Sequence, residues 1–427
     1  MIINFSIENF GSIKNEQTLS FEAENSPRLA EHYITQKGNL RLLKLGMIYG
    51  ANATGKTTIL KALGFLRELV TEPKERKTDE LEFTPFLFSP DTLQKPTVFR
   101  LAFVWNDIKY EYEVQFDKEA VLQEKLDFYH PHKASVYRRE TDRVNRLTRI
   151  NFGSKIRQDA ASKKILEGNT LWNNTVPGGF LKTNIDFKEL AEVTDFFNNF
   201  LLSPVFAHTD LTGFVTSRIH KGEIPKKHVV DILQKADFHI SDIVVKEKEA
   251  DFPEELKNVL EHHFGASHKL KEKSKISSLD LEFIHQVRGE NYALPFAAES
   301  QGTHRYYGFA GLLAFLLHGG RFLPIDELEN SLHPDLFLHF ILAFLTNSEN
   351  SQLLATTHNR EILNEKDIFR YDAIRFTDKK KDCKTELYSL ADFDSSVIRN
   401  TTNILNTYKS GKLGGVPKTG DLYLNFQ

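Results

Sequence analysis

The chain has 427 residues, of which 40% are hydrophobic and 34 are phenylalanine, so it can fill sizeable cores in two or three folded units. Its formal charge of -3, from 55 Lys and Arg against 58 Asp and Glu, excludes a surface that attracts polyanions as a whole. The single cysteine, Cys383, excludes an intramolecular disulfide and a cysteine-rich metal site. No apolar run is long enough to span a bilayer, and we expect a cytoplasmic protein without a membrane partner.

The first 130 residues combine strand and helix patterns. Segment 41–49 is largely apolar and predicts a buried strand, and the apolar positions from Ile59 to Val70 recur at helical spacing just after it. The turn-forming pair Asn106-Asp107 separates two further strands. Strand patterns cover 2–7, 17–23, 97–104, 108–116 and 125–130. We expect an N-terminal lobe over 1–130, with an antiparallel sheet beside the central strand.

Residues 131–275 are more polar and predict a mostly helical inserted subdomain, without the sustained heptads of coiled-coil arms. A C-terminal lobe is predicted over 276–427, where RFLPIDE and QLLATTH form two more apolar strands. The other predicted elements are helices over 187–201, 227–236 and 306–317 and strands over 279–286 and 292–296. Mixed strands and helices in this order predict an α/β fold.

The segment from Gly50 to Thr57 matches the phosphate-loop pattern G-x-x-x-x-G-K-T at every fixed position. Glycines let backbone N–H groups turn toward phosphates, Lys56 can reach the terminal phosphates, and the Thr57 hydroxyl can bind magnesium. A chance glycine turn is a poor alternative, because the segment lies between a predicted strand and a predicted helix. The candidate nucleotide-binding residues of the loop are Gly50, Asn52, Ala53, Thr54, Gly55, Lys56, Thr57 and Thr58.

Two carboxylates, Asp326 and Glu327, end the predicted strand RFLPIDE. Alone, such a pair is as often a surface turn as a site. Phosphoryl transfer needs charge neutralisation and a positioned water in addition to a phosphate loop, so we expect Asp326 to bind Mg²⁺ and Glu327 to act as the base.

Two weaker candidates follow from position. His358 ends the strand QLLATTH, where its imidazole could contact the terminal phosphate or the attacking water, although a lone strand-end histidine is more often structural. Ser300 and Gly302 precede an apolar helix and form a helix start suited to an anion, although simple capping explains them as well.

The order of these motifs resembles the ABC-type ATPase heads of the RecF and SMC class. More closely, the segments NFSIENFGSIKNEQTLSFEA, YGANATGKTT, ESQGT, IDELENSLHP and ATTHN are similar to the small ATP-binding proteins of bacterial phage-defence operons, of the abortive-infection and Rlo type. KADFHISDIVV and YKSGKLGGVP extend the resemblance, whereas Gly11 stands where many relatives have a basic residue.

The resemblance implies an ABC-ATPase-like head with ATP and Mg²⁺ as cofactors. It implies Mg²⁺ binding by Asp326, catalysis by Glu327 with Lys56, and phosphate sensing by His358. Ser300 and Gly302 would contact the ATP held by another subunit, so a homodimer or higher homo-oligomer is implied.

Our leading hypothesis is a slow ATPase that dimerises head to head as a switch or sensor and controls a separately encoded effector, by the resemblance a nuclease, in anti-phage defence. Only 69 residues follow His358, which leaves little room for a nuclease within the chain. Two alternatives stay open: a RecF/SMC-like DNA-repair ATPase, which would bind nucleic acid through a local patch, and a scaffold in which ATP is structural.

Overall fold

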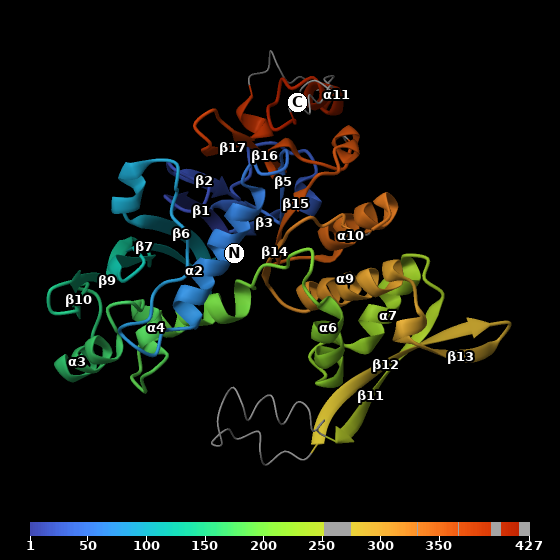
Figure 1. Ribbon diagram of the computed structural model, residues 1–427, viewed down its shortest axis with the longest axis horizontal. Helices are drawn as coiled ribbons and strands as arrows, with labels where there is room; N and C mark the ends of the chain where they lie inside the picture. Colours follow the sequence, from blue (N-terminus) through green and yellow to red (C-terminus); the bar gives the residue numbers. More distant parts are fainter. Residues whose placement is uncertain (252–274, 331, 366, 394–402, 418–427) are drawn as a thin grey trace, which may run out of the picture. The chain divides into compact units, whose positions relative to one another are not determined.

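The computed structural model describes residues 1–251, 275–330, 332–365, 367–393 and 403–417 (Figure 1). By its internal contacts the chain divides into two compact units. Unit 1 comprises Met1–Ala207, Gly319–Asn330 and Leu345–Gln427, and unit 2 comprises His208–His318 and Ser331–Phe344. Within the described residues, no helix combines the length and apolarity needed to cross a membrane.

A five-stranded mixed sheet in unit 1 carries the phosphate loop. Its order is β14-β15-β5-β16-β17; the first four strands are parallel and β17 is antiparallel to β16. The strands are β5 (Leu45–Tyr49), β14 (Phe322–Ile325), β15 (Gln352–Thr357), β16 (Ile374–Lys379) and β17 (Thr385–Ser389). Every residue of β5 is buried, which explains its unbroken apolar sequence, because a central parallel strand is covered on both faces.

A second, seven-stranded sheet in unit 1 is antiparallel throughout, in the order β10-β9-β8-β7-β6-β1-β2. Its strands are β1 (Ile2–Glu8), β2 (Gln17–Ser20), β6 (Thr97–Trp105), β7 (Ile108–Phe116), β8 (Val121–Tyr129), β9 (Lys133–Asp142) and β10 (Leu147–Phe152). The β6–β7 turn at Asn106 and Asp107 has φ of 47° and 60°, as the predicted turn requires. The two sheets confirm the predicted α/β fold, with a mixed sheet around the loop and antiparallel N-terminal strands.

Helix α2 (Lys56–Thr71) packs its apolar face on the antiparallel sheet (Figure 1). The Phe65 ring lies 5.5 to 6.4 Å, between ring centroids, from four other phenylalanines. They are Phe10, Phe83, Phe99 and Phe116. This aromatic cluster fixes the helix whose first residues belong to the phosphate loop.

The predicted boundaries of the inserted subdomain differ from those of the structure. Residues 131–152 were expected in a helical insertion but form β9 and β10 of the antiparallel sheet, and unit 2 begins only at His208. In β10 only Thr148 and Ile150 are buried, so the polar composition reflects a solvent-facing strand side rather than a helix. The adjoining segment 252–274 of the predicted insertion lies outside the described residues.

Unit 2 combines helices with a three-stranded antiparallel sheet, β11-β12-β13. In helix α9, glycines allow close packing on α6: a Cβ on Gly308 would lie 2.5 Å from Leu211, and one on Gly311 would lie 2.3 Å from Val215. The elements of this part are α6 (Leu211–His220), α7 (Lys226–Lys235), β11 (Ile240–Asp251), β12 (Lys275–Val287), β13 (Glu290–Pro295), α9 (Gln301–Leu317) and α10 (Pro334–Asn347), whose last turn lies in unit 1.

The remaining elements of unit 1 are short. They are α1 (Ala30–Tyr33), β3 (Ile34–Lys37), β4 (Leu40–Leu43), α3 (Ala160–Asn169), α4 (Val176–Phe180), α5 (Lys188–Asp195) and α11 (Ile404–Lys409). Single turns of 3-10 or π helix occur at Pro90–Gln94, Phe196–Phe200, Phe296–Ala298, Glu361–Asn364, Tyr371–Ala373 and Leu390–Asp392, of which Phe296–Ala298 lies in unit 2.

Candidate functional site

The phosphate loop connects β5 to α2, and its glycines stand where neighbouring strands leave no space. A Cβ on Gly50 would lie 2.4 Å from the Thr377 hydroxyl oxygen of β16, and one on Gly55 would lie 2.2 Å from the Thr385 hydroxyl oxygen of β17. Gly55 also has φ of 105°, a left-handed conformation that favours glycine. The loop is therefore held in one shape by the adjacent β16–β17 hairpin.

Lys56 is the first residue of α2, and its side chain folds back across the loop. Its Nζ donates to the carbonyl oxygens of Gly50 at 2.8 Å and Ala51 at 3.1 Å. No side chain caps the helix at Gly55, so the first N–H groups of α2 and the ammonium are available to the same anion. Burial lowers the pKa of Lys56, while the carboxylates of Asp326 and Glu327 act against that shift.

Asp326 meets the loop from the end of β14. The Thr57 hydroxyl donates to Asp326 Oδ2 at 2.9 Å, and the Thr356 hydroxyl of β15 donates to Oδ1 at 2.5 Å. Both carboxylate oxygens are thus fixed by hydroxyls from two neighbouring elements. The structure brings together Thr57 and Asp326, which the sequence predicts as partners at one Mg²⁺.

Glu327 and His358 lie next to each other beside this pair. His358 Nε2 is 3.7 Å from Glu327 Oε1, and the side chains are 36% and 43% exposed, so both groups reach solvent. Glu327 has φ of 50°, and its N–H donates to the Thr356 hydroxyl at 2.9 Å. Burial and then the charge of Lys56 lower the pKa of His358, so its imidazole is neutral near pH 7.

A cavity of about 900 Å³ opens over the loop. Its walls come from unit 1: the loop itself, residues that follow β14 and β15, the end of β16, and the last described part of the chain. The residues that line it are Gly50, Ala51, Asn52, Thr54, Glu327, His358, Arg360, Asp378, Lys379, Tyr408, Val416 and Pro417. The cavity therefore joins the loop to both candidate reaction groups.

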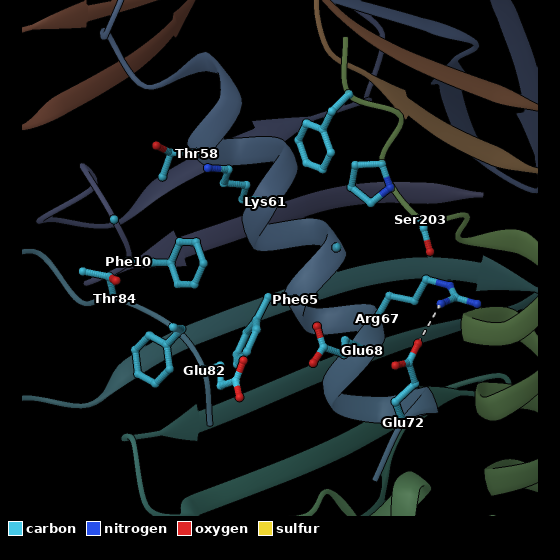
Figure 2. A pocket seen from close by; sticks show the side chains of 15 residues that line it. Phe10, Thr58, Lys61, Phe65, Arg67, Glu68, Glu72, Glu82, Thr84 and Ser203 are labelled. Carbon is cyan, nitrogen blue, oxygen red and sulfur yellow. Dashed lines mark ion pairs between the residues drawn. The ribbon is translucent and has the colours of Figure 1, made fainter. Parts of the chain in front are cut away.

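A second cavity, of about 550 Å³, runs along α2 from Thr58 to Glu72 (Figure 2). Phe10 and Phe65 lie along it, and Figure 2 shows Arg67 facing Glu72 at the far end, with an ion-pair distance of 3.9 Å. At the near end Gly11 is packed against Thr58: a Cβ on Gly11 would lie 2.7 Å from Thr58 Cγ2. The cavity thus begins one residue from Thr57.

Ser300 and Gly302 lie in unit 2, at the start of α9. Ser300 is the N-cap residue, and its hydroxyl oxygen accepts from the Thr303 N–H at 3.1 Å. A Cβ on Gly302 would have only the Ser300 oxygen near it, at 3.6 Å, so no neighbour within unit 2 demands a glycine there. Capping accounts for Ser300, and the contact with another subunit stays a prediction.

The structure adds site residues that the sequence did not indicate. The hydroxyls of Thr356, Thr377 and Thr385 hold the loop or Asp326, and the Glu329 carboxylate accepts from the His358 N–H. Glu329 stands in the motif IDELENSLHP, where a third acid was visible. The threonines gave no signal, because threonine is a common strand residue.

Comparison with solved structures gives similarity at low sequence identity. An SMC head bound to the C-winged helix domain of ScpA is 13% identical, with 91% of this chain and 97% of that chain covered and a TM-score of 0.42. The SMC head domain from Thermotoga maritima is 12% identical, with 91% and 98% covered and a TM-score of 0.39. An Smc head domain with an extended coiled coil, bound to the C-terminal domain of ScpA derived from Pyrococcus furiosus, is 12% identical, with 91% and 96% covered and a TM-score of 0.38.

Among curated proteins no sequence matches the chain. A match to a protein family does cover most of the site: residues 47–166 and 182–364, which include the phosphate loop, Asp326, Glu327 and His358. Because the match spans more than half of the chain, this protein belongs to the family described as "AAA domain, putative AbiEii toxin, Type IV TA system".

Proposed function

We propose that this protein binds ATP with Mg²⁺ at the phosphate loop and hydrolyses it. The observation that carries the proposal is the 2.9 Å hydrogen bond from Thr57 to Asp326, two residues far apart in the sequence. It joins a phosphate loop to an acid at the end of a parallel strand, and Glu327 and His358 line the cavity above the loop. Membership of an AAA-domain family supports the same activity.

The residues of the loop fit a triphosphate. Gly50 and Gly55 allow the backbone to approach closely, and Lys56 and the N–H groups at the start of α2 supply positive charge. Thr57 and Asp326 would hold Mg²⁺ with two oxygens, and phosphate and water usually complete such a site. The bound ion supplies charge neutralisation on the phosphates. The nucleoside would extend past Thr58 into the second cavity, along Phe10.

Glu327 is the proposed base. Its carboxylate is partly exposed on the cavity and can accept a proton from a water molecule. Neutral His358, 3.7 Å away, can donate a hydrogen bond toward the terminal phosphate from one nitrogen. Thr356 orients both acids, because its hydroxyl donates to Asp326 and accepts from the Glu327 N–H.

The proposed role of hydrolysis is a switch. Two copies would close on ATP, with Ser300 and Gly302 of each copy contacting the nucleotide of the other, and hydrolysis would release them. A separate effector, a nuclease by the resemblance, would respond to the closed state during phage infection. The family description, which names a putative AbiEii toxin and a type IV toxin–antitoxin system, supports a role in phage defence.

The native mass of Glu327→Gln, measured with and without ATP and Mg²⁺, tests the switch. Loss of the base blocks hydrolysis and traps the closed state, so we expect the mass to double with nucleotide, while Lys56→Ala serves as the control that stays unchanged. If the mass of Glu327→Gln is the same with and without nucleotide, the result favours the alternative of a scaffold in which ATP is structural.

The link to defence has its own test. In cells that carry the native operon, Lys56→Ala should abolish protection from phage, because the triphosphate can no longer be held. Retained protection, in a variant shown to bind no nucleotide, would contradict the proposed role of ATP.

A further inference from the structure

The last described residues of the chain form a segment that packs on the phosphate loop. We call Asn403–Pro417 the C-terminal strap; it comprises helix α11 and the glycine-containing turn that follows. Two tyrosine hydroxyls bond to carbonyl oxygens of its turn, one from β17 and one from within the strap. Tyr388 of β17 donates its hydroxyl to the Leu413 oxygen at 2.7 Å, and Tyr408 of the strap donates to the Gly415 oxygen at 2.9 Å.

Aromatic packing connects the strap to the strands on either side of the loop. The Tyr408 ring stacks on Phe376 of β16 with centroids 5.3 Å apart. It also meets Tyr49, the residue before Gly50, at 6.4 Å in an edge-to-face arrangement. Both the strap and the strand that leads into the loop are therefore fixed by one buried aromatic group.

The strap also reaches the loop backbone directly. A Cβ on Gly415 would lie 3.4 Å from Gly50 Cα and 3.1 Å from the carbonyl oxygen of Thr377. The next two residues, Val416 and Pro417, line the same cavity as the loop. The strap thus supplies a wall of the cavity and a backbone contact to the first residue of the phosphate loop.

We propose that the C-terminal strap sets the conformation of the phosphate loop and through it the affinity for nucleotide, with Gly415 as the positioning residue. A loop that is held before binding loses less conformational freedom when it closes on phosphates, so loosening or displacing it weakens binding. This inference rests on the proposed nucleotide site. It adds a dependence of that site on Gly415, which stands 365 positions after Gly50 in the sequence.

The decisive comparison is Gly415→Ala against Gly411→Ala. Both glycines have positive φ, 63° and 76°, so both alanines carry similar backbone strain, but Gly411 has no atom within 4 Å of the added Cβ. We expect Gly415→Ala to raise the Kd for an ATP analogue with Mg²⁺ about tenfold, and Gly411→Ala to leave it within about twofold. The thermal unfolding midpoints of the two variants should agree.

A second variant decides the matter if Gly415→Ala does not fold. Tyr408→Phe keeps the ring on Phe376 but removes the hydrogen bond to the Gly415 oxygen. A Kd raised about threefold or more supports the strap as a binding determinant. An unchanged Kd overturns it.

The outcomes separate the two proposals. If the wild-type protein binds nucleotide and Gly415→Ala behaves like Gly411→Ala, the role of the strap is overturned and the nucleotide site stands. If the wild-type protein binds no nucleotide, the proposed function fails and the inference about the strap fails with it.

Discussion

At the level of single residues, the Thr57 hydroxyl links the phosphate loop to Asp326. Thr57→Val removes this hydroxyl at similar volume, and we expect it to abolish the gain in nucleotide affinity that Mg²⁺ gives, because one ion ligand and one contact of Asp326 are lost. Binding of a fluorescent ATP analogue in Mg²⁺ and in EDTA measures this. Thr58→Val is the matched control and should keep the Mg²⁺ effect, because the Thr58 hydroxyl bonds to Ser12 and not to Asp326. If Mg²⁺ still raises the nucleotide affinity of Thr57→Val, Thr57 is not the Mg²⁺ ligand.

The charge on His358 gives a second prediction at this scale. Burial and Lys56 lower the pKa of His358 below its ordinary value near 6.5, so the imidazole takes up its proton only at more acidic pH. A bound triphosphate adds negative charge, which favours the imidazolium, and we expect the pKa to rise when the analogue binds. An NMR titration of the histidine resonances, assigned with His358→Gln, measures both states. If the pKa of His358 falls or stays the same when the analogue binds, the phosphates do not lie near this imidazole.

At the level of elements, helix α2 depends on the phenylalanine cluster beneath it. Phe99 is fully buried in this cluster, and Phe99→Ala should lower the free energy of unfolding of unit 1 by about 3–5 kcal/mol, since it leaves a cavity against Phe65. Urea unfolding followed by circular dichroism measures the change. Phe88 is 69% exposed, so Phe88→Ala should stay within about 0.5 kcal/mol of the wild type. Equal effects of the two substitutions would contradict this packing.

The antiparallel sheet also shows how an element can be misread. Strand β9 carries several charged residues, among them Arg139, which is 1% exposed. Its side chain donates to the carbonyl oxygen of Trp172 at 3.0 Å. Burial lowers the pKa of Arg139 to about 10, and the charge of buried Glu124 acts against that shift. A buried arginine that bonds to residues outside its strand looks like a surface residue in the sequence, which favoured the helical insertion.

At the level of the whole molecule, the proposed contact of Ser300 across a dimer can be tested by mixing. Lys56→Ala and Ser300→Glu should each be inactive alone. In a mixed dimer both substitutions fall in one of the two sites, and the other site keeps the wild-type residues. About half of the dimers in an equal mixture are mixed, so the mixture should regain about a quarter of the wild-type ATPase rate. A mixture that stays inactive, while both variants still exchange subunits, would remove Ser300 from the site.

Three features could be recognised from the sequence by itself. They are the phosphate loop between its strand and helix, the resemblance to a family of ATPases, and the two strand ends that carry Asp326 and His358. These features need only near neighbours: a hydrophobic period, a glycine spacing and a residue at a strand end. The mutual geometry of these residues was decided by the order of strands, because β14, β15 and β5 are parallel neighbours whose carboxyl ends meet at one edge.

Only the tertiary structure showed that Thr377, Thr385 and Gly415 shape the loop, since their closeness to Gly50 and Gly55 arises when a distant hairpin and the C-terminal strap pack beside β5. It also showed that residues 131–152, predicted to belong to a helical insertion, form strands of the antiparallel sheet. Strand pairing and side-chain packing join residues that no local pattern relates, and for this reason the loop motif could be predicted from the sequence whereas its supports could not.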